Sequence, residues 1–91
     1  MPRLMATRAR GIIKSAHSKE QRVFCDLMVE ARKKADLTQE MLAKRLKRPQ
    51  SFVAKYEGGE RRLDVVEFLA VTGAIGVDPV EILRALIRRM S

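Results

Sequence analysis

The segment Leu37–Gly59, LTQEMLAKRLKRPQSFVAKYEGG, predicts two short amphipathic helices joined by a tight turn. Thr38 is a favoured helix cap because its side-chain oxygen accepts an orphan backbone N–H group, and the apolar residues after it recur at helical spacing. Pro49 suits the first turn of the second helix, where its missing N–H group is no loss. Gly58 or Gly59 ends that helix. The segment is therefore expected to form a helix-turn-helix unit.

The rest of the chain also predicts helices, because apolar residues recur at three and four positions and no alternating runs rich in Val, Ile or Thr occur. We expect an all-α fold with five helices. The first begins near Ser18, the fourth at Asp64 with Glu67 as capping-box partner, and the fifth runs from Pro79 to about Met90. The buried residues expected on the first and fourth helices are Phe24, Leu27, Met28, Ala31, Ala35, Val66, Leu69 and Ile75.

Length and charge narrow the class of protein. The 91 residues suffice for one small domain, and 19 Lys and Arg against 11 Asp and Glu give a formal net charge of +8. Residues 1–17 contain basic residues and no acidic ones. The excess of basic residues predicts a polyanionic partner, since Lys and Arg that neutralise phosphates release condensed counterions. A solvated basic surface is the alternative.

The same composition argues against an enzyme. One Cys and one His build neither a metal site nor a nucleophile with its base, and no glycine-rich phosphate loop is present, so no cofactor is expected. Cys25 is read as a small, partly buried residue rather than a redox sensor. No apolar run approaches the roughly 20 residues that span a bilayer. These features predict a cytoplasmic protein, although the Arg-rich start also resembles a transit peptide.

Several of these motifs together resemble the lambda-repressor-like, Cro-type helix-turn-helix family, also called the Xre family. The matching pieces are the LTQ start of the second helix, the LAKRL pattern, PQSFVAKYE as the recognition helix, and the GVDP after the fourth helix. The resemblance covers about Phe24 to Leu83. It implies a regulator from a bacterium or phage, associated with the nucleoid when bound to DNA.

The resemblance implies that helix 49–57 enters the major groove, where each base pair shows a distinct pattern of donors and acceptors. Gln50 would pair with adenine, Ser51 would donate or accept, and Lys55 would meet guanine or a phosphate. Arg48, in the turn, would join them. Phe52 would either meet a thymine methyl or cover the core beside Val53.

Contacts to the DNA backbone and a structural ion pair are also implied. Thr38 and Gln39, at the N-terminus of the second helix, would hold a phosphate there. Arg61 and Arg62 would grip the backbone beyond the recognition helix. A further implication is an ion pair between Arg32 and Glu57, which would fix the recognition helix on the first helix.

Three positions depart from the family pattern. Lys47 replaces a glycine of the turn, so a residue with a Cβ atom is expected to adopt a left-handed backbone at a cost of roughly 1 kcal/mol. Asp36 replaces another glycine and tolerates such a turn better. Gly73 lies inside the fourth helix, where it allows close approach of another helix or chain.

Domains of this size usually read two half-sites as a symmetric dimer, because one recognition helix contacts few bases. The last helix offers more apolar surface than one small core needs, and Leu86, Ile87 and Met90 are the predicted dimer contacts. The alternative is that this helix packs back on the first and fourth helices.

The sequence thus predicts a basic N-terminal arm, residues 1–17, and a Cro-type domain, residues 18–91. The arm is a disordered lead, a short helix through Ile12 and Ile13, or a segment that follows the DNA minor groove. The expected function is sequence-specific binding of double-stranded DNA by a homodimeric repressor or autoregulatory switch on a palindromic operator. The alternative is an interaction protein of the same fold that inhibits another regulator through protein contacts.

Overall fold

The computed structural model describes residues 18–90 of the chain, which form five helices and no strand. They are α2 (Lys19–Lys34), α3 (Gln39–Leu46), α4 (Gln50–Glu57), α5 (Val65–Ile75) and α6 (Pro79–Met90). The all-α prediction is confirmed. The predicted arm, residues 1–17, lies outside the described residues. Within residues 18–90, none of the helices has the length and apolar character needed to cross a membrane.

Helix ends follow the predicted capping residues. The side chains of Ser18, Thr38 and Asp64 each accept a hydrogen bond from the backbone N–H group three residues later. Glu67 completes the capping box on α5, because its carboxylate accepts from the backbone N–H group of Asp64 at 3.0 Å. Pro49 is the N-cap of α4 rather than its first helical residue.

Both predicted left-handed turns are present. Asp36 has a φ of 59° after α2, and Lys47 has a φ of 56° at the end of α3. Gly76 closes α5 at a φ of 90°, a conformation that glycine adopts without strain. Gly73 is exposed, and a Cβ atom there would have no atom within 4 Å, so close packing at this glycine does not occur within residues 18–90.

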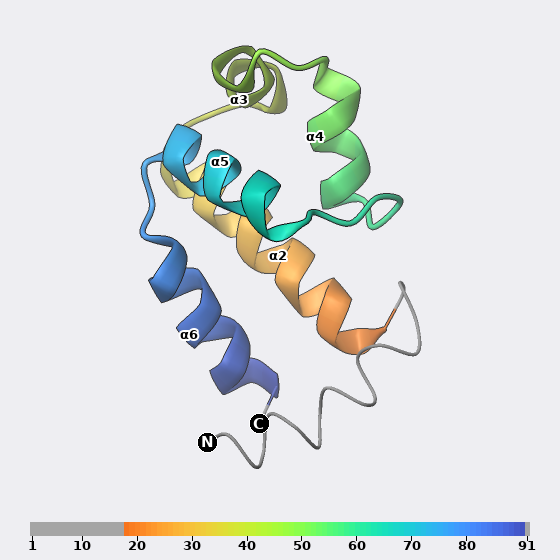
Figure 1. Ribbon diagram of the computed structural model, residues 1–91, viewed down its shortest axis with the longest axis vertical. Coiled ribbons are helices and arrows are strands. Elements are labelled where there is room, and N and C mark those ends of the chain that lie inside the picture. Colours follow the sequence, from red (N-terminus) through yellow and green to blue (C-terminus); the bar gives the residue numbers. More distant parts are fainter. Residues whose placement is uncertain (1–17, 91) are drawn as a thin grey trace.

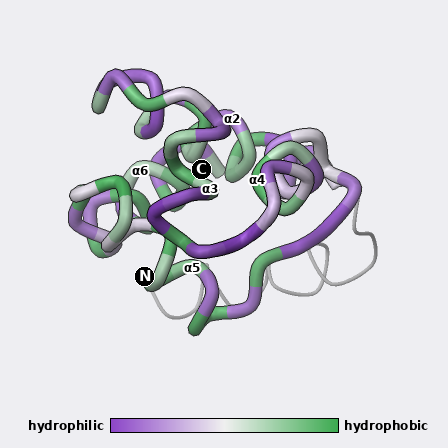
Figure 2. Tube along the Cα trace, turned by 90° about the horizontal axis from the view of Figure 1, so that it is seen from above, coloured by the Kyte–Doolittle hydropathy of each residue, from purple (hydrophilic) through white to green (hydrophobic). Residues whose placement is uncertain are grey.

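All five helices contribute to one core. The long helix α2 runs diagonally through the molecule, α3 and α4 lie above it, and α6 runs beside it along its length (Figure 1). Figure 2 shows a hydrophilic stretch of the chain next to the α3 label. The most deeply buried side chains of the core are Met28, Leu42, Val53, Tyr56, Val71 and Thr72.

The predicted buried face of α5 is wrong at Val66 and Leu69 and confirmed at Ile75. Val66 and Leu69 are 76% and 50% exposed, whereas Phe68 and Val71 pack inward with Ile75. The observed residues lie three and four positions apart, which is one face of a helix. The prediction for Ala35 is also wrong, because α2 ends at Lys34 and Ala35 is exposed.

Candidate nucleic-acid interface

The helix-turn-helix unit is α3, the turn at Lys47–Pro49, and α4. Leu42 and Ala43 bury one face of α3, and Val53 and Tyr56 bury one face of α4, so the two helices are fixed against α2 and α5. Gln50 and Ser51, in the first turn of α4, and Lys55, one turn further, are exposed. The structure therefore places these three predicted base-reading residues on the outward side of α4.

A buried ion pair joins α2 to the end of α4. The guanidinium of Arg32 donates to both carboxylate oxygens of Glu57, at 2.7 and 3.0 Å, and to the carbonyl oxygen of Leu37 at 2.7 Å. The two side chains are only 9% and 5% exposed. Hydrogen bonding to Glu57 raises the pKa of Arg32, so the guanidinium stays charged. The pair holds the C-terminal end of α4 against the scaffold.

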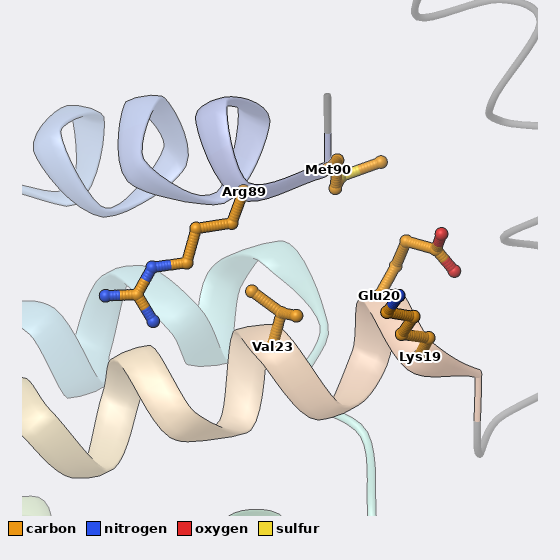
Figure 3. A pocket seen from close by; sticks show the side chains of 5 residues that line it. All are labelled: Lys19, Glu20, Val23, Arg89 and Met90. Atoms are coloured by element: carbon orange, nitrogen blue, oxygen red, sulfur yellow. The ribbon is translucent and has the colours of Figure 1, made fainter.

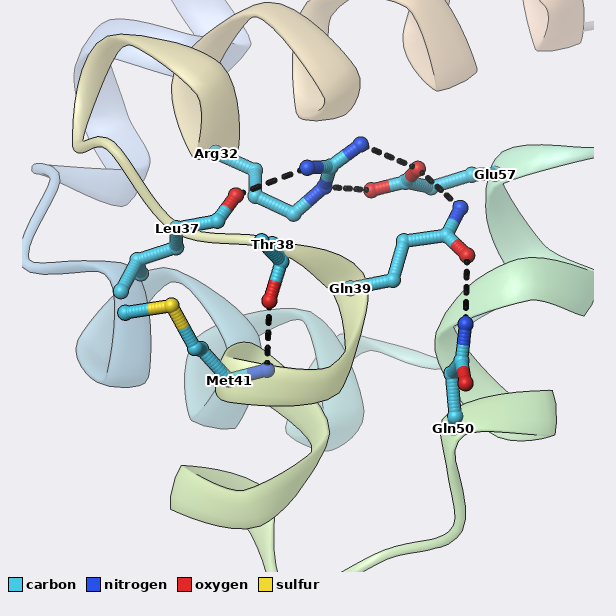
Figure 4. A network of polar contacts seen from close by, with 7 residues as sticks. All are labelled: Arg32, Leu37, Thr38, Gln39, Met41, Gln50 and Glu57. Carbon is cyan, nitrogen blue, oxygen red and sulfur yellow. Dashed lines mark hydrogen bonds and ion pairs between the residues drawn. The ribbon is translucent and has the colours of Figure 1, made fainter.

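The network continues from this pair to the N-terminus of α4 (Figure 4). The amide nitrogen of Gln39 donates to Oε1 of Glu57 at 2.9 Å, and the amide oxygen of Gln39 accepts from the amide nitrogen of Gln50 at 3.4 Å. The sequence pattern did not predict this bridging role for Gln39. The hydroxyl of Thr38 accepts from the backbone N–H group of Met41, so this side chain caps α3.

Phe52 is buried rather than facing outward. Its side chain belongs to the core and is 8% exposed, with its ring 5.6 Å from the ring of Tyr56. This favours the core alternative and corrects the prediction of a base contact by Phe52. The guanidinium groups of Arg48 and Arg61 lie 4.6 and 4.8 Å from the centre of the Phe52 ring.

Arg61 is held by Glu67, a contact the sequence analysis missed. Its guanidinium donates to both oxygens of Glu67, at 3.0 and 2.7 Å, and to the carbonyl oxygen of Arg62. The hydrogen bonds from Arg61 and from the backbone of Asp64 lower the pKa of Glu67 to about 2. The sequence offered one signal for this contact, a basic residue six positions before an acidic one. Across a loop, however, that spacing does not predict a contact.

Several apolar side chains of α5 and α6 are also exposed. Val65, Val66 and Leu69 on α5 and Val80 and Leu83 on α6 are each at least 44% exposed. Of the predicted dimer contacts, Leu86 and Ile87 are half-buried.

Met90 is only 7% exposed and lies beside the start of α2, together with Val23 (Figure 3). This corrects the prediction of Met90 as a surface contact, because α6 packs back on α2.

The arrangement of α3, the turn and α4 is that of a helix-turn-helix protein. The helix-turn-helix family model matches residues 28–82, more than half of the chain. The chain therefore belongs to the XRE-type helix-turn-helix family of DNA-binding transcription regulators.

Among several solved chains that are similar to this one, two serve as examples. One is an XRE-family like protein from Pseudomonas syringae pv. tomato str. DC3000, 47% identical, with a TM-score of 0.75 over 82% of this chain and 94% of that one. The other is a mutant of the restriction-modification controller protein C.Esp1396I, 20% identical, with a TM-score of 0.72 over 80% and 92%. At that identity the second likeness shows the fold alone. No curated protein matches the chain.

Proposed function

We propose that this protein binds a palindromic operator as a homodimer, inserts α4 into the major groove, and acts as a repressor or autoregulatory switch. The observation that carries the proposal is the chain of contacts from Arg32 through Glu57 and Gln39 to Gln50. It links the scaffold to a polar side chain at the exposed start of α4. Such support reduces the entropy that an interface side chain loses on binding.

Gln50 is the proposed adenine reader. Its amide nitrogen has two protons, of which one is directed to Gln39. The second proton and the amide oxygen are available for the N7 and N6 groups of adenine, so Gln50 keeps its bond to Gln39 while it reads the base. Ser51 lies beside it, and Lys55 one turn on reaches guanine or a phosphate.

Backbone contacts are proposed on both sides of α4. The first backbone N–H groups of α3, after Thr38, and the amide of Gln39 face one phosphate. Arg48, Arg61 and Arg62 supply positive charge on the other side. These contacts position α4 but carry no sequence information.

The proposed dimer surface is the exposed face of α5, and its occupant is a second copy of the chain. Val65, Val66, Leu69, Ala70 and Gly73 are exposed at helical spacing, and α5 contains no basic residue. An apolar, uncharged face suits a protein contact rather than a phosphate. Gly73 leaves space for another backbone to approach.

The first test is selection from random duplexes, followed by titration of the selected and a scrambled duplex at several salt concentrations. The proposal predicts a palindrome bound at least roughly a thousandfold more tightly than the scramble. No enriched motif, with weak binding that disappears as salt rises, would instead favour the interaction protein that inhibits another regulator.

The dimer surface is tested by sedimentation of Leu69→Ser and of Leu86→Ser, each with and without the selected duplex. Leu69→Ser should lower the affinity between copies while the monomer keeps its fold, because this side chain is half exposed. If Leu86→Ser weakens association more than Leu69→Ser does, at unchanged helix content, the dimer interface would instead lie on α6.

A further inference from the structure

One carboxylate oxygen of Glu67 attracts two arginines. Its Oε2 atom lies 2.7 Å from Nη2 of Arg61 and 3.8 Å from Nη2 of Arg48. Both guanidinium groups also lie against the ring of Phe52. The four side chains therefore form one cluster, hereafter the Glu67 cluster, which joins the turn before α4, α4 itself, the loop after it and the first turn of α5.

The two arginines are held unequally. Arg61 makes two hydrogen bonds with the carboxylate and one with a backbone carbonyl oxygen. Arg48 is beyond hydrogen-bond distance of Glu67, its side chain is 48% exposed, and within residues 18–90 its guanidinium donates no hydrogen bond. The cluster thus contains one arginine that is hydrogen-bonded to the carboxylate and one, Arg48, whose hydrogen-bond donors are still available.

The position of Arg48 gives this inequality a consequence for DNA. Arg48 lies two residues before α4, and Phe52 is on the first turn of that helix. Phe52 is fixed by burial, and Glu67 is fixed by its capping bond to Asp64 and its bonds to Arg61. Two immobile groups therefore constrain a long side chain that would otherwise lose much rotamer entropy on binding.

We infer that Glu67 and Phe52 are positioning residues. They hold Arg48 at the edge of the recognition helix, where its guanidinium donates hydrogen bonds to DNA. Glu67 keeps its hydrogen bonds with Arg61 in the DNA complex and thereby orders the loop after α4. This inference rests on the proposed function, because it assigns an additional determinant to the same DNA-binding surface.

If Glu67 acted only through its negative charge, its removal would strengthen DNA binding. Removing an acidic residue from a protein that binds a polyanion raises its affinity for every duplex. If Glu67 positions Arg48, its removal should weaken binding to the selected duplex while binding to the scrambled duplex stays the same or increases. The ratio of the two affinities therefore distinguishes positioning from general electrostatics.

The test is Glu67→Gln, measured by titration of the selected and the scrambled duplex. Glutamine is accepted at this position of a capping box, so α5 keeps its cap while the carboxylate charge is lost. The matched control is Glu81→Gln, which changes the net charge equally but disrupts only an exposed pair with Arg84 on α6. We expect the affinity ratio to fall about tenfold in Glu67→Gln and to stay unchanged in Glu81→Gln.

A double-mutant cycle with Arg48→Gln identifies the residue through which Glu67 acts. Once Arg48 is removed, Glu67→Gln should have little further effect on the selected duplex. Additive losses, or equal ratios in Glu67→Gln and Glu81→Gln, would overturn the inference. If the wild-type chain itself selects no motif, the proposed function fails first, so the two failures are distinguishable.

Discussion

Replacing Arg32 by Met tests how much the ion pair with Glu57 contributes to folding. The substitution keeps an apolar stem but removes three hydrogen bonds and leaves a carboxylate that is only 5% exposed without its cation. Breaking a buried pair in this way costs about 3–5 kcal/mol. For a domain of this size each kcal/mol shifts the melting temperature by about 4–8 °C, so the loss should reach at least about 12 °C.

The assay is urea and thermal unfolding followed by circular dichroism, with Arg84→Met as the control. Arg84 pairs with Glu81 on the surface, at 64% and 56% exposure, so its loss should cost less than about 1 kcal/mol. The double variant Arg32→Met with Glu57→Gln should recover part of the stability, because no buried charge then lacks a partner. Equal costs for Arg32→Met and Arg84→Met would refute this account of the pair.

Three further predictions concern the backbone, the core and pH. Lys47→Gly should stabilise the domain by about 1 kcal/mol in urea unfolding, because Lys47 has a φ of 56°. As a control, Lys44→Gly within α3 should destabilise the domain by a similar amount. Stabilisation by both substitutions would contradict the backbone argument. Tyr56→Phe should leave stability unchanged or raise it by about 1 kcal/mol, since the buried hydroxyl has no hydrogen-bond partner in residues 18–90, and a large loss on melting would show that a partner exists. The pKa of Glu67 is lowered from 4.5 to about 2, so its charge stabilises the fold above pH 4.5 and this contribution is lost as the pH falls toward 2. Acid titration should therefore show that the stability difference between wild type and Glu67→Gln shrinks over that pH range. A constant difference would count against this role of the Glu67 charge.

Capping and turn residues made most of the fold predictable. Thr38 and Asp64 start helices in the sequence and in the structure, because their side chains satisfy backbone groups within three residues. Asp36 and Lys47 end helices in the left-handed conformation. Local hydrogen bonding decides such features, so the local sequence predicts them.

The face of α5 could not be predicted, because its sequence is almost uniformly apolar. VVEFLAVTGAI gives nearly every face of the helix apolar side chains, so periodicity does not distinguish Val66 from Phe68. The surrounding helices decide which of them is buried. The same limit applies to Met90, whose burial depends on how α6 packs against α2.

Part of the candidate site was predictable from the resemblance, and part depends on tertiary contacts. The outward positions of Gln50 and Lys55 follow from helical spacing once Val53 is placed inward. The bridge from Gln39 to Glu57 and the contact between Arg61 and Glu67 join residues across loops, where neither spacing nor charge pattern specifies the partner.

The most direct test of the proposed DNA reading is titration of the selected and the scrambled duplex with wild type and Gln50→Ala at one salt concentration. The side chain of Gln50 is exposed and is hydrogen-bonded only to Gln39 within residues 18–90, so the variant should keep the melting temperature of the wild type. We expect Gln50→Ala to lose about 1–3 kcal/mol of binding free energy on the selected duplex and to keep its affinity for the scrambled duplex. Equal affinity of both proteins for the selected duplex would contradict the claim that the start of α4 reads DNA.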